Sequence, residues 1–240
     1  MAIQLPRDLD ASVQAAVRHF WDTRSTQARK QRQAGSVDQG ARSAVTGGAQ
    51  MNGFIDLFAE LALWAGARPE NILRGSQAVL PGLFCPSRQW DLLVKREEQV
   101  VCAYRFASVT GLAAGEELDR RTEEAIASAH DLWGAYRQSA INFDIQPWLG
   151  YVLVAEDEDS FRPASRANAR VSNMLPEFRQ ASSARRFELL CSRLVRERLY
   201  SDAALLLVKK DGTYTGPADD LTLAHLCRVL VSRVTYLVAA

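Results

Sequence analysis

The sequence predicts an α/β fold in which helices flank a mixed β-sheet. Two β-rich segments, 89–95 and 99–106, are separated by a short polar turn at 96–98, which is typical of an antiparallel hairpin. Two continuous apolar runs, 149–155 and 203–208, have the length and composition of central strands buried on both faces. Helical segments alternate with these runs, and strands joined through helices are expected to be parallel with right-handed crossovers.

The helices are expected where apolar residues recur at a spacing of three to four. The segments are 8–31, 51–65, 116–139, 182–200 and 217–238. Segment 116–139 has the clearest pattern, and Glu116 and Glu117 in its first turn are favoured by the helix macrodipole. Segment 69–81 is predicted to hold a turn and a short strand.

A length of 240 residues suits one domain with a sizeable core. We expect one domain over 1–240, with a helical N-terminal part (1–66), a sheet core (67–210) and a C-terminal helix (211–240). The most apolar segment, 222–240, contains His225, Arg228 and Arg233, so no membrane span is expected. The N-terminus has no apolar signal core, which favours the cytoplasm. The four cysteines are far apart, which argues against a disulfide framework or a zinc site.

Positive charge is concentrated in parts of the chain although the net charge is only +1. Segment 162–198 has nine arginines against three acidic residues, a local balance of +6. Segment 1–50 has seven basic residues against four acidic ones. Contacts with nucleic-acid phosphates need local rather than global charge. Because 25 of the 29 basic residues are arginines, codon bias and a solvated surface explain the same pattern, and charge alone leaves both interpretations open.

Six stretches resemble one family, and they follow in that family's order from about residue 20 to residue 200. They are 38–48 (DQGARSAVTGG), 51–54 (MNGF), 80–84 (LPGLF), 90–94 (WDLLV), 121–133 (RTEEAIASAHDLW) and 187–194 (FELLCSRL). They resemble type II restriction endonucleases of the XhoI family, within the PD-(D/E)XK superfamily of nucleases. The resemblance implies a restriction-endonuclease-like core and a homodimer that binds palindromic, CTCGAG-like double-stranded DNA in a bacterial restriction-modification system.

The resemblance also implies a site in which an Asp on one strand and Glu-x-Lys on the next hold Mg²⁺ and activate water. Asp91 matches the first Asp, but Arg105 and Ala107 stand where the family has Glu and Lys. The strand period places residues 105 and 107 on one face together with Val101 and Ala103. We expect Arg105 to pair with Asp91, so that Asp91 is the one remaining metal ligand, or only a salt-bridged strand residue, and no Mg²⁺ is bound.

Two glutamates on the following helix, Glu123 and Glu124, are possible substitutes for the missing carboxylate. Lys95 shares the face of Asp91 but lies four residues along, roughly 13 Å away at about 3.3 Å per residue. The candidate DNA-binding residues are Arg42, Arg88, Arg120 and Arg121, each of which could also be an ordinary surface arginine.

Three functions therefore remain open. The first is a DNA-binding, cleavage-impaired relative of these endonucleases. The second is an active Mg²⁺-dependent type II site-specific deoxyribonuclease that uses Asp91 and helical carboxylates. The third is a partner or regulatory protein without DNA affinity. The family pattern has further polar residues where Ala41, Asn52 and Cys85 stand here, which favours the first.

Overall fold

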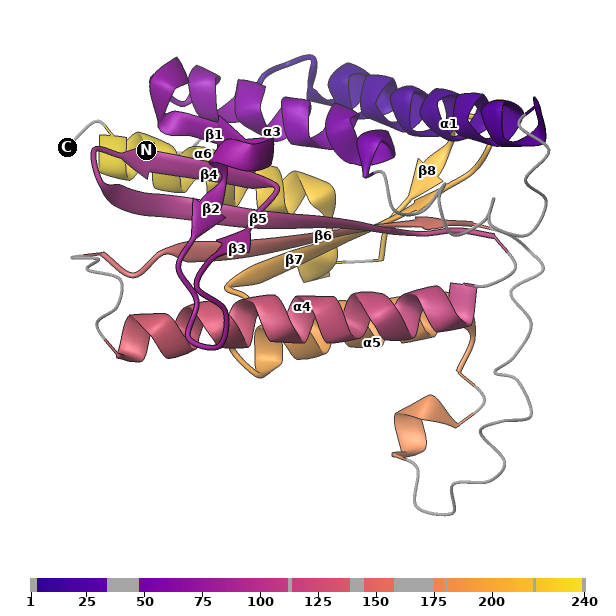
Figure 1. Cartoon of the computed structure of the whole chain (residues 1–240). Helices are drawn as coiled ribbons and strands as arrows, with labels where there is room; N and C mark the ends of the chain where they lie inside the picture. The colour runs from indigo at the N-terminus through magenta and orange to yellow at the C-terminus, as the bar shows by residue number, and fades with distance from the viewer. Residues whose placement is uncertain are drawn as a thin grey trace.

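Six strands form one mixed sheet in the computed structural model (Figure 1), which describes residues 4–33, 48–111, 114–138, 145–157, 175–179, 181–217 and 219–238. The spatial order is β1-β4-β5-β6-β7-β8. The strands are β1 (Ile72–Arg74), β4 (Leu92–Arg96), β5 (Gln99–Val109), β6 (Trp148–Glu156), β7 (Asp202–Val208) and β8 (Tyr214–Thr215). Strands β5, β6 and β7 are parallel, whereas β1, β4 and β8 pair antiparallel with their neighbours. The predicted α/β class, a mixed sheet flanked by helices, is confirmed.

Helices cover both faces of this sheet (Figure 1). The helices α1 (Leu9–Gln33), α3 (Asn52–Trp64) and α6 (Leu223–Val238) pack on one face. The helices α4 (Ala114–Arg137) and α5 (Ser183–Arg196) pack on the other and carry the crossovers from β5 to β6 and from β6 to β7. Short 3-10 helices occur at Ala49–Met51, Pro69–Asn71, Gly75–Gln77, Pro176–Phe178 and Asp219–Leu221.

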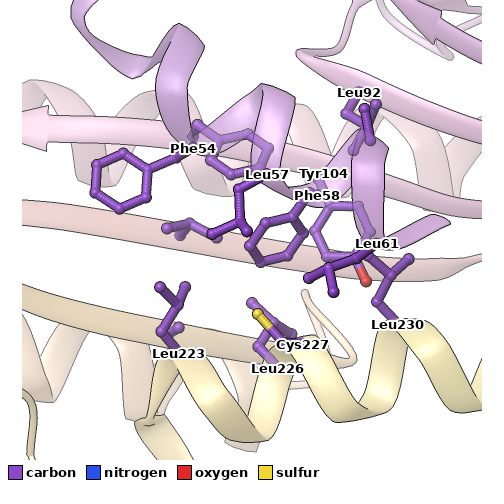
Figure 2. Packing of buried hydrophobic residues seen from close by; sticks show 14 of the residues in the cluster. Phe54, Leu57, Phe58, Leu61, Leu92, Tyr104, Leu223, Leu226, Cys227 and Leu230 are labelled. Carbon is purple, nitrogen blue, oxygen red and sulfur yellow. The ribbon is translucent and has the colours of Figure 1, made fainter. Parts of the chain in front are cut away.

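The core on the α3 and α6 side is built from apolar side chains spaced for one helix face. Figure 2 shows Phe58 and Leu61 of α3 above Leu226 of α6, with the ring of Tyr104 from β5 beside them. The Phe58 ring meets Tyr104 and Phe106 edge-on, at centroid distances of 5.1 and 5.2 Å. These fully or nearly fully buried aromatic residues fix the face of β5 that points toward α3 and α6, so the other face of β5 is held toward α4.

The prediction that Val101 of β5 shares a face with Ala103 is wrong. The register shifts between Val94, which pairs with Cys102, and Lys95, which pairs with Val100. Val101 is therefore the extra residue of a β-bulge, which interrupts the alternation of faces. It packs with the α3 and α6 core rather than with Ala103 on the α4 side. The bulge precedes residue 103, so the alternation beyond it is regular.

Element boundaries differ from the expected ones where capping decides them. The hydroxyl of Ser182 accepts a hydrogen bond from the Arg185 amide at 3.2 Å, so α5 begins at Ser183. The helix ends before Arg198, whose φ of 57° leaves the helical region. The expected extension of this helix to residue 200 is wrong, and α6 begins at Leu223 rather than at residue 217.

A separate hairpin, β2 (Val79–Leu80) and β3 (Arg88–Gln89), lies in front of the sheet, and its loop reaches α4 (Figure 1). The sequence predicts residues 89–95 as one strand, but the structure divides them. Gln89 ends β3, β4 begins at Leu92, and Asp91 lies in the bend between them. Within the described part of the chain, no helix has the length and apolar character that crossing a membrane requires.

Candidate functional site

Asp91 and Arg105 face each other across neighbouring segments of the sheet. The Asp91 amide donates to the Tyr104 carbonyl at 3.1 Å, which holds Asp91 opposite Arg105 on β5. The Asp91 Oδ2 accepts a hydrogen bond from the Phe106 amide at 2.8 Å and lies 3.8 Å from Nη1 of Arg105. The same Nη1 donates to the Gln89 carbonyl at 2.9 Å. The two side chains are 28% and 24% exposed, so the pair lies at the edge of the core.

Burial raises the pKa of the Asp91 carboxyl above its ordinary value, although Arg105 and the Phe106 amide act in the opposite direction. A partly buried carboxylate is costly unless a positive charge lies close to it. Arg105 supplies that charge, so the two residues depend on each other.

A small cavity of about 10 Å³ lies beside this pair, between β5, β6 and α4. Its lining includes Arg105 and Ala107 from β5, Tyr151 from β6, and Arg121 and Glu124 from α4. Tyr151 is the register partner of Arg105 and is 2% exposed. Its hydroxyl is shut off from solvent and has no hydrogen-bond partner among the described residues. The cavity has about the volume that a single water-sized atom needs.

The arginines and glutamates of the first turns of α4 form a self-neutralising network. Arg121 lies 2.9 Å through Nε from Glu117 and 2.9 Å through Nη1 from Glu124. Its Nε also donates to the Ser108 carbonyl at 3.3 Å, which ties α4 to β5. Arg120 contacts the same two glutamates. Glu124 thus reaches the cavity but is already engaged by two guanidinium groups.

The other predicted site residues are distributed differently. Glu123 is exposed and lies outside the cavity lining. Lys95 pairs with Glu98 at 3.2 Å, away from Asp91. Arg88 is turned toward α4, where its Nε donates to Asp131. Arg42 lies outside the described residues. Of the candidates, the structure therefore brings Asp91, Arg105, Ala107, Arg121 and Glu124 together.

Asp131 is a buried carboxylate that sequence reasoning did not single out. It is 1% exposed, and it accepts hydrogen bonds from the Phe84 amide at 2.6 Å and from Arg88 Nε at 2.9 Å. A Cβ at Gly82 would lie 2.2 Å from Asp131 Oδ2, so only glycine lets the loop approach so closely. Phe84, which is 71% exposed, stacks on His130 at 5.9 Å. The carboxylate thus fixes the loop between β2 and β3 on α4.

A family profile described as "Restriction endonuclease XhoI" matches residues 30–219 of the chain. The chain belongs to the XhoI restriction endonuclease family. Its curated relatives in this family include the type II restriction enzyme BstVI of Geobacillus stearothermophilus, which is 34% identical over 212 residues, covering 85% of this chain and 95% of the relative. The type II restriction enzyme AbrI of Azospirillum brasilense is 35% identical over 186 residues, covering 77% of this chain and 80% of the relative.

The type II restriction enzyme XhoI of Xanthomonas vasicola is 30% identical over 197 residues, covering 81% of this chain and 78% of the relative. No solved structure gives a significant match to the chain. The predicted family is therefore confirmed by sequence comparison, and it is a family of site-specific DNA endonucleases that bind double-stranded DNA.

Enzymes of the XhoI family are of the type II class, which generally depends on Mg²⁺. The residues around Asp91 do not fit that ion. Among the described residues, no group of three or more His, Cys, Asp or Glu side chains could hold a metal ion. Arg105 places a positive charge 3.8 Å from the carboxylate. A divalent cation about 4 Å from a guanidinium is opposed by several kcal/mol even at an effective dielectric constant of about 20.

Proposed function

We propose that this chain is a DNA-binding member of the XhoI family that has lost most or all of its cleavage activity. The observation that carries the proposal is that Arg105 and Ala107 lie on β5, next to the bend that holds Asp91. The resemblance to the family implies that its Glu and Lys stand at these two positions. Asp91 faces a cation, Glu124 is engaged by two arginines, and no lysine is among the residues described around them, so the site lacks the means to hold a metal ion and to stabilise a hydroxide.

The proposed ligand is palindromic, CTCGAG-like double-stranded DNA, bound by a homodimer. Two-fold symmetry in the DNA is matched by two-fold symmetry in the protein. Arg185, Arg196 and Arg198 are exposed on and just after α5, in the arginine-rich segment. Arg185 pairs with Glu188, which leaves Arg196 and Arg198 as the better candidates for phosphate contacts at this end of the segment.

Binding should be steeply salt-dependent. Because each neutralised phosphate releases counterions, every arginine contact contributes about one unit to the slope of log affinity against log salt. We expect Arg196→Gln with Arg198→Gln to lower the slope by about two units if both contact phosphates. Fluorescence anisotropy of a CTCGAG duplex over a salt series measures this. Arg74→Gln, on the exposed Arg74–Asp56 pair at the sheet edge, is the control.

The same titration separates the proposal from a partner protein without DNA affinity. A shift of the CTCGAG duplex at low salt, stronger than that of a scrambled duplex, is the expected result. Absence of any binding at low salt would remove the DNA-binding proposal and favour an interaction protein.

An active nuclease is the second candidate, because Glu124 of α4 lines the same cavity as Arg105. In this alternative Asp91 and Glu124 would hold the metal ion together. The contacts of Glu124 with Arg120 and Arg121 weigh against it, since both would have to release the carboxylate first. Cleavage of a plasmid that contains the site distinguishes the two candidates.

A further inference from the structure

The cavity beside Asp91 is lined by hydrogen-bond donors that the described residues leave unused. The contacts of Arg105 with described residues all run through Nη1, to the Gln89 carbonyl and Asp91. Those of Arg121 run through Nε and Nη1. A guanidinium has five N–H donors, so Nη2 of both arginines and Nε of Arg105 remain available. The Tyr151 hydroxyl adds one more donor without a partner among these residues.

The carboxylate oxygens that line this cavity, those of Glu124, are already engaged. Asp91 lies next to the lining, where its Oδ2 accepts from the Phe106 amide. Each oxygen of Glu124 is contacted by one arginine, Oε1 by Arg120 and Oε2 by Arg121. The unused polar side-chain groups of the described lining are therefore donors, and a cavity lined by spare donors selects an acceptor atom, above all one that carries negative charge.

The depth of the cavity also favours such a ligand. Tyr151 is 2% exposed, whereas the side chains of Arg121 and Arg105 are 14% and 24% exposed. The arginines thus connect the buried hydroxyl with the surface. A volume of about 10 Å³ accommodates one oxygen atom but not a whole tetrahedral anion. The anion must remain outside and insert a single oxygen.

We propose that this cavity binds one non-bridging oxygen of a DNA backbone phosphate, held by Arg105, Arg121 and the Tyr151 hydroxyl without any metal ion. The proposal rests on the DNA-binding function proposed above and adds a specific contact to it. In this arrangement the residue that opposes a metal ion becomes the residue that holds the phosphate. DNA is retained at the altered site by guanidinium groups, and no bond is broken.

The first test is DNA affinity in EDTA, measured by anisotropy with the CTCGAG duplex. Arg105→Gln should weaken binding by about 10- to 100-fold, as expected for the loss of a charge-assisted contact, and should lower the salt slope by about one unit. Tyr151→Phe should weaken binding by about tenfold and leave the slope unchanged, because it removes a hydrogen bond but no charge.

Matched controls keep this test specific. Tyr104→Phe removes an equally buried hydroxyl that also has no hydrogen-bond partner in the described part of the chain, from the opposite face of the same sheet, and Arg74→Gln removes a surface charge. Both should leave affinity within about twofold of the parent. Arg105→Lys retains the charge and should retain the salt slope, and it separates loss of contact from loss of folding.

A second test begins with the parent protein, for which no variant has to fold. A neutral methylphosphonate is placed at each backbone position of the duplex in turn. One position per half-site should weaken binding by the parent by about tenfold or more, and the same position should have no further effect on Arg105→Gln, since both changes remove one contact.

The outcomes are distinguishable. If the parent does not bind the duplex at low salt, both the proposed function and this inference fail. If the parent binds, but Arg105→Gln and Tyr151→Phe bind as tightly as the controls, the DNA-binding function stands and the phosphate site is overturned. Binding that requires Mg²⁺ and is abolished by EDTA would also overturn the phosphate site, because the cation rather than Arg105 would then hold the phosphate.

Discussion

Replacing Arg105 with Glu and Ala107 with Lys together should create a Mn²⁺ site that the parent lacks. The new carboxylate would stand opposite Asp91, and the positive charge now 3.8 Å from Asp91 would be gone. Reversing one unit charge near a divalent ion changes the interaction energy by several kcal/mol at an effective dielectric constant of about 20. Affinity should therefore rise by at least about 100-fold, measured by calorimetric titration.

The controls for this variant separate charge removal from ligand creation. Arg105→Gln with Ala107→Lys removes the opposing cation without adding a carboxylate and should gain little affinity. Adding Asp91→Asn to the Glu–Lys variant should abolish the gain. Cleavage need not return, because Ala41 and Asn52 also depart from the family pattern. If the Glu–Lys variant folds yet binds Mn²⁺ no better than the parent, the assignment of positions 105 and 107 to the site is wrong.

Replacing Asp131 with Ala should be the most destabilising single change at the surface between the β2–β3 loop and α4. It removes the acceptor for the Phe84 amide and leaves Arg88 with an unpaired charge that is 27% exposed. Breaking a buried pair by removing one partner costs about 3–5 kcal/mol in the free energy of unfolding. Asp56→Ala, at an exposed pair with Arg74, should cost less than about 1 kcal/mol. Urea denaturation of both variants and the parent checks the contrast.

The contribution of Asp131 should also depend on pH. Burial alone would raise the pKa of its carboxyl, but the hydrogen bonds from Phe84, Arg88 and Cys85 together lower it below the ordinary value. A carboxyl with a lowered pKa in the folded state stabilises the fold above the unfolded pKa of about 3.9, and loses that contribution as the pH falls through the folded value. The stability difference between the parent and Asp131→Asn should therefore be constant near pH 7 and shrink below about pH 4. A difference that grows toward acid pH would contradict the assigned hydrogen bonds.

The order of the main helices and of β5, β6 and β7 could be predicted from sequence because β6 and β7 are continuous apolar runs and each helix has its own periodicity, whereas the two-residue strand β8 was not predicted. The bulge at Val101 could not, because Val100, Val101 and Cys102 are all apolar and period alone does not show which of them is the extra residue. The division of 89–95 between β3 and β4 depends on a hairpin that no local pattern separates from the following strand.

The sequence motifs predicted only part of the candidate site. Asp91 stands in a stretch that resembles the family, and the placement of Arg105 and Ala107 on the next strand at the positions of the family's Glu and Lys stays a prediction. Tyr151 lies in an apolar run, where nothing distinguishes a core tyrosine from one that lines a cavity. The hydrogen-bond partners of Asp131, Arg88 and Phe84, lie 43 and 47 residues away in the sequence. The burial of Asp131 therefore comes from tertiary contacts, which the pattern of its own helix does not show.

The most direct test of the central claim is cleavage of a supercoiled plasmid that contains one CTCGAG site. The protein is incubated with the plasmid and Mg²⁺ or Mn²⁺ at concentrations at which anisotropy shows the site to be occupied. We expect the bound plasmid to remain supercoiled, because Arg105 and Ala107 leave no carboxylate pair and no lysine beside Asp91. A unique linear product that disappears with Asp91→Ala would show an active nuclease and contradict the account.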